Sequence, residues 1–112
     1  MKKLEIVIKP EKLEELKAIL EESKANGLMI TNIMGYGNQK GHKQIYRGTE
    51  YSVNLLPKVK VESVVSTEVA EVIVEKVLKQ INTGNYGDGK IFIYDVDDVV
   101  RIRTGDRGLD AL

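Results

Sequence analysis

The elements predicted along the chain indicate an α+β domain with the ferredoxin-like βαββαβ arrangement and an antiparallel sheet. Two stretches have the apolar period of a helix, and four stretches suggest strands, most of them by alternating apolar and polar residues. Together they form two successive strand–helix–strand units separated by a long polar segment. The length of 112 residues favours one domain with one core, so we treat residues 1–112 as a single domain.

The first unit is predicted from alternation, a proline and a glycine. Leu4, Ile6 and Ile8 alternate with other residues, which is typical of a half-buried strand. Pro10 suits the first position of the helix that follows, and Gly27 is expected to end that helix. The predicted elements are a strand over 3–9, a helix over 11–24 and a strand over 28–36.

The second unit begins after Pro57 with a strand that has Val59, Val61 and Val65 on one face. Ser66 is expected to cap the following helix. The predicted core stripe of that helix is Val69, Val72, Ile73, Val77 and Ile81. The predicted elements are a strand over 57–65, a helix over 67–81, a strand over 90–96 and a short strand over 99–103.

This topology places both helices on one face of the sheet, so the other face needs a different cover. In a chain this small the simplest cover is another subunit. We therefore expect a homo-oligomer of small domains.

Composition narrows the function classes. Seventeen basic and seventeen acidic residues cancel, which gives no reason to expect a nucleic acid or a direct membrane partner. The absence of cysteine excludes disulfides and thiolate zinc sites, and His42 is the only histidine, so a Ser-His-Asp triad is disfavoured. The apolar stretch at the N-terminus is too short for a signal peptide or a membrane span, so we expect a cytoplasmic protein.

The polar segment from Gly35 to Leu55 has neither a helical period nor a sustained strand period. A structureless stretch of roughly twenty residues is uncommon inside a compact domain and is usually functional. We interpret it as a mobile arm that carries binding residues on a rigid scaffold.

The stretch from Gly84 to Lys90 fits the G-x-x-x-x-G-K pattern of a phosphate-binding P-loop. Ile91 stands where a magnesium-binding Ser or Thr is needed, and the stretch runs from helix to strand instead of strand to helix, so a standard P-loop is rejected. Its glycines still expose backbone N–H groups that can bind an anion beside the Lys90 charge. A plain glycine turn is the alternative.

Arg101 and Arg103 are predicted on one strand face, an arrangement suited to binding phosphate oxygens. Lys58 shares a predicted sheet face with Lys60 and Glu62. Each group alone is equally compatible with a solvated sheet edge. Their convergence with the glycine loop favours a nucleoside triphosphate site.

Six short runs follow one another along the chain: GYGNQKGH at 35–42, YRGTEY at 46–51, LPKVK at 56–60, TG at 83–84, GDGKIF at 87–92 and RIRTG at 101–105. Together they resemble the PII nitrogen-regulatory signal-transduction proteins. The likeness extends from the first strand to the C-terminal end. It implies a homotrimer of ferredoxin-like subunits with a T-loop at about 37–55, a nucleotide-binding B-loop at about 82–90 and a C-terminal loop at about 102–112.

The resemblance also implies effectors and site residues. Family members bind ATP or ADP, and they bind 2-oxoglutarate together with magnesium-ATP. The implied nucleotide-binding residues are Met29, Gly35, Gly37, Asn38, Glu62, Val64, Gly87, Asp88, Gly89, Lys90, Arg101 and Arg103. The implied 2-oxoglutarate-binding residues are Gly37, Gln39, Lys40, Gly41, Lys58 and Gly87, with Gln39 also completing the coordination of magnesium.

The implied activity is signalling without catalysis. Targets in the family include ammonium transporters, glutamine synthetase and its modifying enzymes, so a membrane is met only through a transporter. Tyr51 matches a tyrosine that is uridylylated in many bacterial members, and Arg47 matches a residue that enters the pore of an ammonium channel.

Asn38 and Met29 depart from the family's common Arg and frequent Thr at these positions. Two alternatives remain, a slow ATP-hydrolysing enzyme that uses the same nucleotide site and a purely structural module.

Overall fold

The computed structural model covers residues 1–112 and describes residues 1–35, 42–46, 49–53 and 55–112, of which 42–46 and 49–53 are described by their backbone only. The strands are β1 (Lys2–Ile8), β2 (Met29–Gly35), β3 (His42–Tyr46), β4 (Thr49–Val53), β5 (Leu56–Val65) and β6 (Lys90–Asp95). The helices are α1 (Leu13–Glu22), α2 (Thr67–Gln80) and the short 3₁₀ helices η1 (Pro10–Lys12) and η2 (Gly108–Ala111).

Four strands form one sheet in the order β2-β5-β1-β6, and every neighbouring pair is antiparallel. Ile6 in β1 lies opposite Val61 in β5 and opposite Ile91 in β6. This order is the one that the ferredoxin-like arrangement requires, so the predicted fold class is confirmed.

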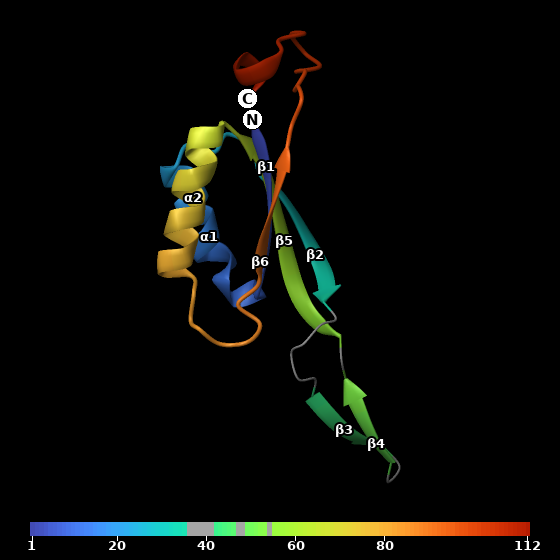
Figure 1. Cartoon of the computed structure of the whole chain (residues 1–112). Coiled ribbons are helices and arrows are strands. Elements are labelled where there is room, and N and C mark those ends of the chain that lie inside the picture. The colour runs from blue at the N-terminus through green and yellow to red at the C-terminus, as the bar shows by residue number, and fades with distance from the viewer. Residues whose placement is uncertain (36–41, 47–48, 54) are drawn as a thin grey trace.

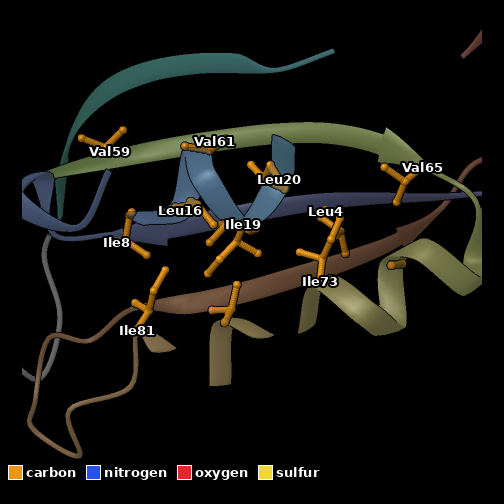
Figure 2. Packing of buried hydrophobic residues seen from close by; sticks show 13 residues of the cluster. Leu4, Ile8, Leu16, Ile19, Leu20, Val59, Val61, Val65, Ile73 and Ile81 are labelled. Atoms are coloured by element: carbon orange, nitrogen blue, oxygen red, sulfur yellow. The ribbon is translucent and has the colours of Figure 1, made fainter. Parts of the chain in front are cut away.

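Both helices cover the same face of the sheet (Figure 1). The core lies between this face and the helices, and Figure 2 shows its side chains converging from β1, β5, α1 and α2. It consists of Leu4, Ile6, Ile8, Leu16, Ile19, Leu20, Val59, Val61, Val65, Ala70, Ile73, Val77 and Ile81. Of the stripe predicted for α2, Val69 packs at the edge of this core, whereas Val72 is 44% exposed and does not belong to it.

The opposite face of the sheet, here called the open face, carries charged and aromatic side chains. Lys3 Nζ lies 3.6 Å from Glu62 Oε1 and 4.7 Å from the centre of the Tyr94 ring. Lys60 Nζ is 4.0 Å from the same Glu62 oxygen. In the part of the chain that the structure describes, no helix covers this face. Nor does any described helix have the length and apolar character needed to cross a membrane.

The interpretation of 35–55 as an arm without secondary structure is wrong for part of this stretch. Strands β3 and β4 pair as an antiparallel hairpin, with His42 opposite Val53 and Tyr46 opposite Thr49. Backbone hydrogen bonds within the hairpin form the ladder, so a strongly alternating pattern is not required. Figure 1 shows the hairpin beyond the end of the four-stranded sheet, next to the ends of β2 and β5.

The helix predicted over 11–24 begins and ends differently. Pro10 opens the 3₁₀ turn η1, and the α-helix starts only at Leu13. At the other end Lys24 adopts a left-handed conformation with φ of 62°, and Ala25 N–H donates to Leu20 O at 3.0 Å. This pair of features is a Schellman motif, so the helix ends before Gly27.

The short strand predicted over 99–103 is absent from the structure. Val100 forms a single bridge with Arg107, and the residues between them make a turn. Asp98 holds this turn, because its carboxylate accepts from Arg107 Nη1 at 2.7 Å and from the backbone N–H of Val99 and of Gly108. Local side-chain bonds of this kind compete with strand pairing.

Candidate functional site

The predicted binding residues within the described part of the chain fall into two groups at opposite ends of the open face. One group surrounds the B-loop, between α2 and β6. The other surrounds a pocket where β2 begins and β5 ends. Figure 1 shows the two ends as the α2–β6 connection and the segment that follows β6.

The B-loop is built around glycines with positive φ. Gly84, Gly87 and Gly89 have φ of 80°, 89° and 107°, a region that other residues rarely adopt. At Gly89 a Cβ atom would lie 1.8 Å from the carbonyl oxygen of Val7 in β1. Glycine is therefore required here, both for the backbone conformation and because the loop packs directly on the neighbouring strand.

Asp88 holds the shape of the B-loop from within. Its carboxylate accepts from Thr83 Oγ1 at 2.5 Å, from Thr83 N–H at 2.7 Å and from Gly84 N–H at 3.0 Å. The hydrogen bond from the Thr83 side chain is the main reason that the pKa of Asp88 is lowered. Sequence reasoning placed Asp88 around the phosphates, and in the structure its oxygens bind the loop itself.

Lys58 joins strand β5 to the B-loop. Its Nζ donates to the carbonyl oxygen of Gly87 at 3.0 Å. Gly35, at the end of β2, makes this possible, because a Cβ there would lie 3.0 Å from Lys58 Cγ and would crowd the lysine stem. Three residues predicted from two different motifs, Gly35, Lys58 and Gly87, are thus brought together.

Burial lowers the pKa of Lys58, and the positive charge of Lys9 lowers it further. The same Lys9 charge contributes to lowering the pKa of Asp88. Lys9 therefore lies close enough to the B-loop to add to its positive potential, and sequence reasoning did not single it out. It follows the end of β1, and nothing in the sequence alone connects it to a loop some eighty residues later.

The second group lines a pocket of about 480 Å³. Its walls are Asn26, Gly27, Leu28, Met29, Ser63, Val64, Arg101, Ala111 and Leu112. Three of these, Met29, Val64 and Arg101, were predicted as nucleotide-binding. The pocket combines an apolar wall with one guanidinium group, which is the character of a site for a ligand with an apolar ring and an anionic group. Glu62 lies one residue from this wall and is held by Lys3 and Lys60.

The wall of the pocket is fixed by a buried hydroxyl group. Ser63 is 2% exposed, and its Oγ donates to the carbonyl oxygen of Gly27 at 2.7 Å. This bond ties the connection between α1 and β2 to strand β5. Because Ser63 alternates with valines on the core face, the sequence pattern gave no sign of its role.

Arg103 does not share a strand face with Arg101, because the residues lie in a turn. Arg103 is exposed, whereas Arg101 is partly covered and lines the pocket. Gly37, Asn38, Gln39, Lys40, Gly41 and Arg47 lie outside the described residues. Tyr51 lies in β4, of which only the backbone is described.

The distance between the two groups matters for what they can bind. Lys58 and Val64 are on the same strand and the same face, six residues apart, which corresponds to about 20 Å. Within one chain, the B-loop and the pocket are therefore separated by most of the length of the sheet.

Comparison with known proteins identifies the family of this chain. The family model "Nitrogen regulatory protein P-II" matches residues 1–106. The chain belongs to the P-II nitrogen regulatory protein family.

Curated P-II relatives match over the full length. The nitrogen regulatory protein P-II of Rhizobium meliloti is 52% identical over 112 residues, which cover 100% of both chains, and that of Rhodospirillum rubrum is 48% identical with the same coverage. A solved structure of B. subtilis GlnK is similar with a TM-score of 0.80 and 38% identity, covering 99% of this chain and 97% of that chain. The P-II family assignment and the ferredoxin-like fold are thus supported by sequence and by structure.

Proposed function

We propose that this P-II protein is a non-catalytic sensor that binds ATP or ADP, binds 2-oxoglutarate together with magnesium-ATP, and reports these states to targets through residues 37–55. The observation that carries the proposal is the hydrogen bond between Lys58 Nζ and Gly87 O. It connects the lysine expected to bind a carboxylate of 2-oxoglutarate with the loop expected to bind the nucleotide phosphates. A ligand that attracts the Lys58 ammonium group must therefore act on the B-loop as well.

The chemistry of the B-loop end suits anions. The glycine backbone, Lys90, Lys58 and the nearby Lys9 provide N–H groups and positive charge in one place. The expected magnesium contact of Gln39 lies outside the described residues. In the described B-loop the carboxylate of Asp88 is engaged by Thr83 and Gly84, and the other groups are cations and N–H donors. In this proposal magnesium would screen the negative charge of the phosphates and of 2-oxoglutarate while Lys58 orients the carboxylate.

The positions of the two groups support a site shared between copies. A nucleotide cannot contact the B-loop and the pocket of one chain if they are about 20 Å apart along the strand. Bringing the B-loop end of one copy against the pocket end of the next solves this, and such head-to-tail contacts close into rings. The homotrimer is part of the proposal, with one nucleotide between each pair of neighbours.

A regulatory role is favoured over ATP hydrolysis. The one carboxylate of the B-loop, Asp88, already accepts three hydrogen bonds from the loop and is poorly placed to act as a general base. Target binding is assigned to residues 37–55, and the targets proposed are an ammonium transporter, glutamine synthetase or its modifying enzymes. A steady-state assay that gave many ATP turnovers per second would overturn the non-catalytic role.

The proposal is tested by calorimetric titration of 2-oxoglutarate into the protein with and without magnesium-ATP. We expect binding only when magnesium-ATP is present. Lys58→Met should abolish this binding and leave ATP affinity largely intact, because methionine keeps the stem beside Gly35 but removes the charge opposite the carboxylate.

Lys60→Met is the matched control. Lys60 is on the same strand face two residues away and pairs with Glu62 instead of the B-loop. It should leave 2-oxoglutarate binding unchanged. Tight binding of 2-oxoglutarate without nucleotide, or equal loss of both ligands in Lys58→Met, would contradict the roles assigned.

A further inference from the structure

Arg101 is engaged by its own chain at both ends of its guanidinium fork. Nη1 lies 3.4 Å from Asp106 Oδ2, and Nη2 donates to the backbone oxygen of Leu112 at 3.2 Å. Both partners belong to one segment, Asp106–Leu112, here called the strap. Ala111 and Leu112 of the strap also line the pocket beside Arg101.

This arrangement has a chemical consequence. A guanidinium group binds a phosphate or carboxylate in a bidentate manner, through two parallel N–H groups. Here the two terminal nitrogens already face a carboxylate and a backbone oxygen, and the Asp106 charge offsets the Arg101 charge. An anion that enters the pocket therefore competes with these groups for the terminal nitrogens of Arg101.

We propose that Asp106 sets the affinity of the pocket for anionic ligands by competing with them for Arg101. This inference rests on the proposed nucleotide-binding function and adds a residue that acts against binding. In the structure Asp106 and Leu112 of the strap bind Arg101, and a bound anion would take the place of Asp106.

The geometry distinguishes a competitor from a permanent support. The Asp106 contact is long at 3.4 Å, and the side chain of Asp106 is 45% exposed, so the carboxylate is free to move into water. The turn is held by other bonds. Arg101 N–H donates to Asp106 O at 2.9 Å, Gly105 N–H donates to Arg101 O at 2.7 Å, and Asp98 holds Arg107 and Gly108. The Asp106 side chain is therefore not needed for the fold of the turn.

The two roles predict opposite signs for one substitution. If Asp106 competes with the ligand, Asp106→Asn raises affinity, because asparagine fills the same space without the charge. If Asp106 instead orients Arg101 in the bound state, the same change lowers affinity. Asp110→Asn is the matched control, since it removes an equal charge from the same strap. Within the described residues, no hydrogen bond or ion pair joins Asp110 to Arg101.

Affinities for magnesium-ATP and for inorganic tripolyphosphate are measured by calorimetry, with NMR of the Arg101 Nε–H group as a local report. We expect Asp106→Asn to bind both probes about two- to fivefold more tightly, the range that corresponds to an exposed ion pair. Asp110→Asn should match the unmodified protein. Affinity that is unchanged or lower in Asp106→Asn, or an equal gain in Asp110→Asn, would overturn the inference.

Tripolyphosphate separates this inference from the proposed function. If the unmodified protein binds tripolyphosphate with a shift at Arg101 but does not bind nucleotide, the proposed function fails and the competition is still measured. If tripolyphosphate causes no change at Arg101 in any of the three proteins, Arg101 is not an anion site and the inference fails.

Discussion

At the scale of single residues, two glycines of the B-loop allow the cost of backbone strain to be distinguished from the cost of a steric clash. Gly84 and Gly89 both have positive φ, so an alanine at either position strains the backbone. They differ in their surroundings. A Cβ at Gly84 would have nothing within 4 Å, whereas a Cβ at Gly89 would lie 1.8 Å from Val7 O.

We therefore predict unequal costs for the two alanine substitutions. Gly84→Ala should lower the free energy of unfolding by about 1 kcal/mol through backbone strain alone. Gly89→Ala should cost about 3 kcal/mol or more, because the clash with β1 adds overpacking to the strain. Urea unfolding of both variants measures the difference, and equal midpoints would show that the B-loop moves away from β1 at no cost.

Some residues of the candidate site could be proposed from the sequence because they belong to short local motifs. Gly87, Gly89 and Lys90 stand in one short glycine-rich run, and the structure places that run at one end of the sheet. Ser63 and Lys9 carry no such signal. Ser63 acts through a bond to Gly27, 36 residues away, and such pairings become visible only when the register of the strands is known.

At the scale of elements, strands and helices with a clear period were predicted correctly, and the errors lie where local bonds override it. Residues 99–103 alternate as a strand does, yet Asp98 binds neighbouring N–H groups and makes a turn instead. The end of α1 was expected at Gly27 because glycine favours a left-handed conformation, but Lys24 adopts it first. Apolar and polar residues alternate too weakly in β3 and in β4 for either strand to be recognised before its pairing with the other is known.

The connection between α1 and β2 depends on one buried hydroxyl group, which gives a prediction at this scale. Ser63→Ala removes the bond to Gly27 O and should lower the free energy of unfolding by about 1 kcal/mol. It should also weaken nucleotide binding several-fold, because Gly27 and Leu28 form part of the pocket wall. Binding is measured by calorimetry at a temperature where both proteins are fully folded.

Ser23→Ala is the control for this prediction. Ser23 is also buried, its Oγ accepts from Lys76 Nζ at 3.4 Å, and it is not among the residues that line the pocket. It should lose a similar or smaller amount of stability and keep the nucleotide affinity of the unmodified protein. Equal affinities in Ser63→Ala and Ser23→Ala would mean that the Ser63 bond supports the fold without shaping the pocket.

At the scale of the whole molecule, the open face and the two separated groups of binding residues have a common explanation. In the proposed ring, a second copy that covers the open face would also bring its own B-loop to the pocket of its neighbour. Assembly and ligand binding would then depend on each other, because each proposed site is made by two chains. A ligand that bridges the chains should stabilise the assembly by mass action.

Mixing two inactive variants tests this division of the site. Lys90→Ala damages the B-loop half and Arg101→Ala damages the pocket half, so each variant alone should bind nucleotide poorly. If the two chains are co-expressed with different tags, each three-membered ring that contains both variants has one interface with two undamaged halves, so about a third of the sites in the mixed rings should regain binding. Calorimetry on the doubly purified mixed assemblies gives the number of sites restored.

A mixture of Arg101→Ala with Arg103→Ala separates true complementation from a general effect of mixing. Both residues follow β6 and both are assigned to nucleotide binding, so in this mixture every chain supplies a damaged second half of the site and no site should recover. Recovery in the first mixture but not in the second requires that one copy supplies the B-loop and another supplies the arginines. No recovery in either would mean that the B-loop and Arg101 serve the same ligand within one chain, which the length of β5 between them makes difficult, or that they bind different ligands.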